Sequence, residues 1–229
     1  MGKQDSEASP ELQEIFRKHF RESLQHDSGL EYEEFSLFEW YAKETDSLIA
    51  SMRQAEAAEL RRQQAAGVEV LNDSGMVAVD YFERRTRYSH VIFLASVFEG
   101  YLTRACGNLA RVLNPAEMPF ALEELVGEKW IKRRRFLERY GRFTLTSDEW
   151  AVADELARVR NVLVHENGSV ASLSDKQRAE LESRPGLKLE AYELVIESQY
   201  VQTLSKGLQH LIATIQARIQ RRARELQGP

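Results

Sequence analysis

The residues of this chain best suited to chemistry are an arginine, an asparagine and a histidine that lie within six positions, from Arg160 to His165. Arginine carries a planar, permanently charged guanidinium whose donors fit a phosphate group. Histidine can take up or release a proton near neutral pH, and Asn161 adds an amide between the two. A phosphate-binding cation beside a proton-transfer group suits work on a phosphodiester.

A predicted amphipathic helix must position these side chains, and they lie at its end. Ser147 is a favourable N-cap residue for this helix, and Asp148 and Glu149 suit the positive end of the helix dipole. Residues 166–168, Glu-Asn-Gly, predict the helix stop, because asparagine and glycine readily adopt the left-handed conformation found there.

Helical geometry divides the three residues between two directions. At about 100° per residue, Asn161 and His165 share one ridge with Arg158 beside them, whereas Arg160 lies on the flank, about 140° from His165. The length of the arginine side chain could reunite them, or a second copy of the helix across a twofold axis could. The predicted core stripe of this helix consists of Val152, Leu156, Val159 and Leu163.

The run Arg-Asn-x-x-x-His at a helix end, before a Gly-containing loop, resembles the signature of the HEPN superfamily (higher eukaryotes and prokaryotes nucleotide-binding domains). The apolar helix over residues 88–113 also resembles the helix that packs beside the motif helix in that family. The resemblance covers about Met76 to Arg224. It implies an all-α, up-and-down helical bundle and a metal-independent ribonuclease of toxin, phage-defence or stress systems, which acts as a homodimer whose motif helices meet.

The resemblance also implies a role for each motif residue. His165 would act in proton transfer at the 2′-hydroxyl or the leaving oxygen, Arg160 would stabilise charge on the phosphate, and Asn161 would orient the phosphate or His165. The product would be a 2′,3′-cyclic phosphate. We expect no cofactor and no metal, because a 2′-hydroxyl nucleophile needs none and the sequence has no convincing cluster of metal ligands.

The expected partners are RNA as substrate, a second copy of the chain, and a regulatory protein. HEPN toxins that are silenced by nucleotidyl transfer carry a tyrosine two residues after the histidine, but Asn167 stands there in this chain. A binding antitoxin or a larger defence assembly therefore fits better as the regulator than a nucleotidyl-transferring partner.

Several other polar residues are weaker candidates, each with a structural alternative. Glu99 lies in an apolar helical run and could hold Arg160 or Arg104, or it could be an edge glutamate that reaches solvent. His90 fits a satisfied core or boundary histidine better than a catalyst. The RNA-contact candidates are the basic residues Lys132, Arg133, Arg134 and Arg135, whose alternative is a solvated helix face that balances nearby glutamates.

Composition supports the fold class and limits the function. The 229 residues include only five prolines and twelve glycines, which leaves long stretches without helix breakers and predicts an all-α protein. The net charge of −5 excludes a general attraction to nucleic acid, so RNA binding would need local clusters of cations. Cys106 is the only cysteine and fits a small core residue in a reducing compartment. With a polar start and no long apolar span, a cytoplasmic protein without membrane association is expected.

Hydrophobic periodicity predicts two domains. Residues 1–75 form a helical extension with helices over 11–24 and 34–65, and residues 76–229 form the HEPN-like bundle after a linker at 67–75. The bundle should contain a brief extended segment over 187–191 and helices over 77–113, 127–140, 147–165, 174–183 and 197–225.

Two other functions stay open. The chain could be a non-catalytic HEPN-like module that binds RNA, a nucleotide or another protein, which the acidic net charge and the extra N-terminal helices favour. It could also be a plain helical scaffold in which the motif arose by chance.

Overall fold

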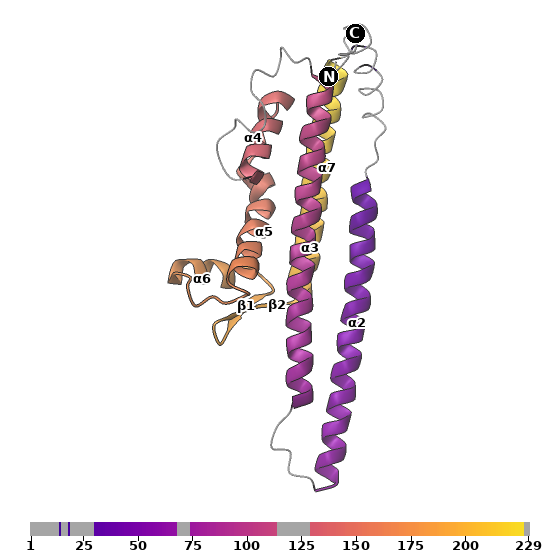
Figure 1. Cartoon of the computed structure of the whole chain (residues 1–229), viewed down its shortest axis with the longest axis vertical. Coiled ribbons are helices and arrows are strands. Elements are labelled where there is room, and N and C mark those ends of the chain that lie inside the picture. Colours follow the sequence, from indigo (N-terminus) through magenta and orange to yellow (C-terminus); the bar gives the residue numbers. More distant parts are fainter. Residues whose placement is uncertain (1–13, 15–17, 19–29, 68–73, 114–128, 227–229) are drawn as a thin grey trace, which may run out of the picture. The chain divides into compact units, whose positions relative to one another are not determined.

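The described part of the chain is an all-α helical bundle with one short antiparallel hairpin (Figure 1). The computed structural model describes residues 30–67, 74–113 and 129–226, with the isolated residues 14 and 18. The predicted all-α class with one short extended segment is confirmed. The predicted helix over residues 11–24 and most of the predicted linker lie outside the described residues.

The described residues form six helices and two strands. None of these helices is both long enough and apolar enough to cross a lipid bilayer. The elements are α2 (Leu30–Ala65), α3 (Ser74–Val112), α4 (Lys129–Gly141), α5 (Ser147–His165), α6 (Asp175–Glu182), β1 (Leu187–Glu190), β2 (Glu193–Ile196) and α7 (Ser198–Glu225).

The chain divides into two compact units, and each unit combines segments that are distant in sequence. Among the described residues, the first unit contains 14, 18, 30, 98–113, 129–150 and 210–226, and the second unit contains 31–67, 74–97 and 151–209. Both units are discontinuous in sequence, so they do not test a division of the chain at residue 75. The predicted boundary between 1–75 and 76–229 stays a prediction.

In the first unit, aromatic packing and a capping box fix the start of α5. Phe98 and Trp150 are almost fully buried, and their ring centroids lie 5.9 Å apart. Thr146 Oγ1 accepts the Glu149 N–H at 3.2 Å, and the Thr146 N–H donates to Glu149 Oε2 at 2.8 Å. The N-cap is therefore Thr146, and the prediction of Ser147 was wrong by one residue. The reciprocal bonds between positions 146 and 149 satisfy two backbone donors, which Ser147 could not do together with Glu149.

In the second unit, the hairpin contains one strand that the sequence pattern missed. β1 and β2 pair antiparallel from Leu187 opposite Ile196 to Glu190 opposite Glu193. The turn between them uses positive φ at Ala191 (45°) and Tyr192 (68°), the geometry of a tight hairpin turn. Neither residue is a typical choice for such a turn, and the apolar residues 194–196 do not alternate, so the usual hairpin signals were absent.

Candidate functional site

The end of α5 is fixed by a helix stop that requires glycine. Both predicted stop residues adopt the left-handed conformation, Asn167 at φ 53° and Gly168 at φ 84°, and the Gly168 N–H donates to Val162 O at 3.1 Å. A Cβ atom on Gly168 would lie 2.3 Å from the hydroxyl oxygen of Tyr88 on α3. The chain after His165 can therefore turn against α3 only because residue 168 has no side chain.

The hairpin and α3 hold the loop that follows this helix stop. The Leu194 N–H donates to Gly168 O at 2.8 Å, and the Val170 N–H donates to Tyr192 O at 2.8 Å. The hydroxyl of Tyr88 donates to Leu194 O, so it joins α3 to the same strand. Figure 1 shows the hairpin and α6 next to the end of α5. The loop that follows His165 is thus fixed by hydrogen bonds to the hairpin, and the hairpin is hydrogen-bonded to α3.

Asn161, His165 and Arg158 line one exposed pocket between the end of α5 and α6. The pocket has a volume of about 300 Å³. The ridge inferred from helical geometry is thus one wall of a concave surface. On the inner side of the same helix, Leu156, Val159 and Leu163 are buried as predicted, and Val152 is half-buried. The remaining lining residues of the pocket are Val162, Glu166, Leu173, Gln177 and Leu181.

Arg160 does not line the pocket, but its side chain turns towards it. Its Nη1 atom donates to Asn161 Oδ1 at 3.2 Å. Among the described residues, Arg160 has no carboxylate within ion-pair distance, so its charge is not neutralised. Within one copy of the chain, the long side chain of Arg160 therefore reaches from the flank of α5 to Asn161 on the ridge. It does not reach His165 by a hydrogen bond among the described residues. Whether a second copy adds to the site stays a prediction.

Arg158 is held by an acidic partner on α6. Its Nη1 atom lies 3.2 Å from Glu180 Oε2, with both side chains 41% exposed. A capping box at Ser174 and Gln177 fixes the start of α6 and therefore the position of Glu180. Because Glu166 also lines the pocket, the wall carries charges of both signs. Arg158 therefore lines the pocket but is already paired with the carboxylate of Glu180. Arg160 is the arginine better able to bind an anion.

Glu99 lies in the first unit and pairs with cations of α4. Its Oε1 atom is 3.4 Å from Arg133 Nη1 and 3.7 Å from Lys129 Nζ, and its side chain is 36% exposed. These contacts fit the edge glutamate that the sequence left as an alternative. A link from Glu99 to Arg160 or Arg104 stays a prediction.

Arg133 and Arg134, which belong to the predicted RNA-contact cations, contact acidic side chains. Arg133 contacts Glu99, as described above. Arg134 lies 3.1 Å from Glu138, donates to Leu145 O at 2.5 Å, and places its guanidinium carbon 5.1 Å from the centre of the Trp150 ring. These arginines help to hold α4 within the first unit. The other two candidates, Lys132 and Arg135, are half-buried and exposed respectively.

Cys106 is the buried core residue that the sequence predicted. Its side chain is 3% exposed, and burial raises the pKa of its thiol to about 12. The described residues contain no group of three or more His, Cys, Asp and Glu side chains that could hold a metal ion.

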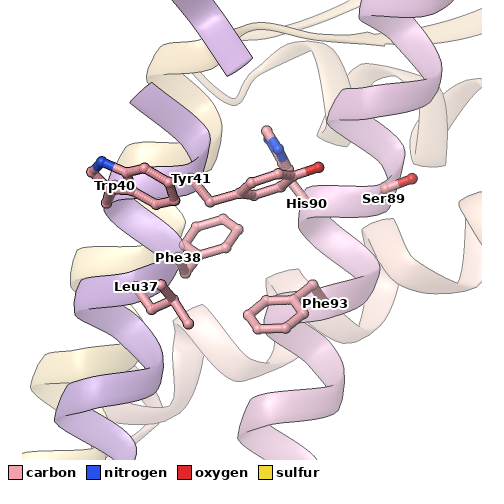
Figure 2. A pocket seen from close by; sticks show the side chains of 7 residues that line it. All are labelled: Leu37, Phe38, Trp40, Tyr41, Ser89, His90 and Phe93. Atoms are coloured by element: carbon pink, nitrogen blue, oxygen red, sulfur yellow. The ribbon is translucent and has the colours of Figure 1, made fainter. Parts of the chain in front are cut away.

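The sequence interpretation of His90 as a satisfied core or boundary histidine was correct for its burial and wrong for its hydrogen bonding. His90 is 1% exposed, and neither of its ring nitrogens has a hydrogen-bond partner among the described residues. It lines a second pocket, between α2 and α3, that we did not predict (Figure 2). Tyr41 and Leu48 belong to the apolar periodicity of α2, yet they are 50% and 52% exposed. Because exposure depends on tertiary packing, the sequence pattern alone did not indicate this pocket.

With both sites described, the chain can be compared with known proteins. No family model, curated protein or solved structure matches it. Arg160, Asn161 and His165, with the pocket that Asn161 and His165 line, are therefore the features that indicate a function.

Proposed function

We propose that the chain is a metal-independent endoribonuclease of the HEPN type, from a toxin, phage-defence or stress system. One observation carries the proposal: Asn161 and His165 share an exposed pocket, and the guanidinium of Arg160, which no carboxylate of the described residues neutralises, is hydrogen-bonded to Asn161. A proton-transfer group and a cation at the phosphate are among the parts that cleavage by a 2′-hydroxyl needs, and the amide can bind a phosphate oxygen.

The hydrogen bond between Arg160 and Asn161 defines what the amide can do. Because Asn161 Oδ1 accepts from Arg160, the amide NH₂ points away from the arginine and can donate to a phosphate oxygen. Arg160 then stabilises the charge that builds up on the phosphate during attack. His165, at the exposed end of α5, exchanges a proton with the 2′-hydroxyl or with the leaving oxygen.

Strand cleavage needs both a general base and a general acid, and His165 supplies one of them. In the proposed homodimer, a second His165 comes from the partner helix across the twofold axis. Within one copy, the carboxylate of Glu166 lines the same pocket and is the competing candidate. We expect Glu166→Gln to retain cleavage. If it abolishes cleavage while a sedimentation experiment finds a monomer, the composite site is wrong and a single copy does the chemistry.

The test of the proposed nuclease is cleavage of transfer RNA and total RNA by purified protein in EDTA. We expect His165→Ala to lower the cleavage rate by roughly 10²-fold to 10⁴-fold, and Arg160→Ala to lower it similarly. Both side chains are at least partly exposed, so the variants should fold. The matched controls are His210→Ala and Arg221→Ala, which remove an exposed histidine and an exposed arginine of α7. Equal cleavage by all four variants would contradict the proposal.

A specific observation keeps the non-catalytic module as a second candidate. The carboxylate of Glu166 lines the pocket, and that of Glu180 pairs with the lining residue Arg158, so both oppose a phosphate. A growth assay separates the two functions: induced wild-type protein should be toxic, and the Arg160→Ala, His165→Ala double variant should be harmless. RNA binding without cleavage, together with harmless expression of the wild type, would favour the binding module.

A further inference from the structure

The pocket between α2 and α3 in the second unit has aromatic walls (Figure 2). Its volume is about 440 Å³, within the range of small-molecule sites. Phe38 and Phe93 stack with their ring centroids 5.5 Å apart and an angle of 9° between their rings, so their faces are nearly parallel. The lining residues are Leu37, Phe38, Trp40, Tyr41, Ser89, His90 and Phe93.

Unusually large apolar side chains stay exposed at this pocket. Leu37 is 64% exposed, Trp40 is 60% exposed and Phe93 is 45% exposed. A ligand that covers them would gain about 25 cal/mol of binding free energy for each Å² of apolar surface removed from water. An occupant with apolar faces would recover part of that free energy.

His90 adds a specific polar requirement to this apolar site. Two aromatic rings stand edge-on to its imidazole, Phe38 at 5.5 Å and Tyr41 at 5.3 Å between ring centres. Within the part of the chain that the structure describes, neither ring nitrogen has a hydrogen-bond partner, although buried polar groups nearly always have one. A neutral imidazole offers one donor and one acceptor. The lining of the pocket therefore has unused hydrogen-bonding capacity next to aromatic rings.

The charges around the pocket indicate the class of ligand. None of its lining side chains is a lysine, arginine, aspartate or glutamate. The nearest charged groups that act on His90 are Arg87 and Asp46, and these are paired with each other. A phosphate, carboxylate or ammonium group would enter this pocket without a countercharge. An uncharged ligand fits best.

We propose that this pocket binds a small, uncharged, planar aromatic molecule that carries an N–H or O–H group, and that this group donates to a ring nitrogen of His90. The stacked phenylalanines and Trp40 hold the flat faces of the ligand. Tyr41, half exposed at the outer wall, covers the imidazole, and rotation of its side chain gives the ligand access to the nitrogen. The proposal does not depend on the nuclease activity, because it uses none of the residues of α5.

Indole and indene are suitable probes, since they share a shape and differ in the N–H donor. We expect both to bind the full chain saturably in ligand-observed NMR and calorimetric titrations, with indole tighter by roughly 2-fold to 10-fold, the worth of one hydrogen bond. In His90→Phe the preference for indole should disappear while indene still binds. In His90→Gln, which keeps a polar acceptor, part of the preference should remain.

Two further variants test the aromatic walls. Trp40→Ala should weaken both probes, whereas Tyr192→Ala, which removes an exposed ring at the hairpin turn, should weaken neither. Circular dichroism shows whether each variant is folded. Failure of both probes to saturate the wild type would overturn the proposal, and so would an unchanged indole preference in His90→Phe. If neither probe binds and Trp40→Glu dissociates a dimer, the pocket is instead part of an interface between copies of the chain.

Discussion

Burial of His90 should make the protein lose stability in mild acid. Burial, followed by the charge of Arg87, lowers the pKa of His90 from 6.5 to about 4. Between these two pH values the unfolded chain binds a proton at this residue and the folded chain does not. The free energy of unfolding must therefore fall as the pH is lowered from 6.5 towards 4.

The expected size follows from linkage between the two pKa values. The loss approaches about 1.4 kcal/mol per pH unit inside this window and reaches roughly 2 kcal/mol between pH 7.5 and pH 5. His90→Phe removes the titrating group and both unsatisfied nitrogens but keeps an aromatic ring beside Phe38 and Tyr41. This variant should lack that part of the acid sensitivity and should match or exceed the wild type in stability at pH 5.

The assay is urea unfolding of wild type and variant at several pH values from 7.5 to 5, at one fixed protein concentration. His210→Ala removes an exposed histidine and should keep the wild-type slope of stability against pH. Parallel curves for wild type and His90→Phe would refute the reasoning. They would mean that His90 either has a partner or takes up its proton in the folded state.

Three further predictions concern the elements that support the sites. Gly168→Ala should destabilise the fold by about 2 kcal/mol or more, because its φ is 84° and a Cβ would meet Tyr88; a loss below about 0.5 kcal/mol in urea unfolding would contradict this. Thr146→Ala should cost about 0.5–2 kcal/mol and Ser147→Ala clearly less, and the reverse order would return the N-cap to Ser147. Cys106 should react with iodoacetamide only after unfolding, since burial raises its pKa to about 12; rapid labelling of the native protein would show that it is accessible.

The helices were predictable from the sequence because their apolar periodicity is long and uninterrupted. The start of α5 shows the limit of that reasoning. Thr146 and Ser147 are both good caps, and only the pairing with Glu149 three residues later distinguishes them. The sequence carries that signal, because Glu149 stands three residues after Thr146.

Side-chain partners across elements could not be predicted, because they depend on where elements distant in sequence come to lie. The exposed ridge of Asn161 and His165 followed from helical geometry, but the pairing of Arg158 with Glu180 required the position of α6. In the same way, apolar periodicity does not say which side chains stay exposed. Tyr41 lies at a periodic apolar position and still lines an open pocket.

The most direct test of the central claim is the chemistry of the RNA ends that the protein makes in EDTA. If His165 and Arg160 promote attack by the 2′-hydroxyl, the fragments should carry 2′,3′-cyclic phosphates and 5′-hydroxyls. A substrate with a single 2′-deoxynucleotide at the cleavage position should resist cutting there. Fragments with 3′-hydroxyl and 5′-phosphate ends, or equal cutting at the deoxynucleotide, would contradict the account.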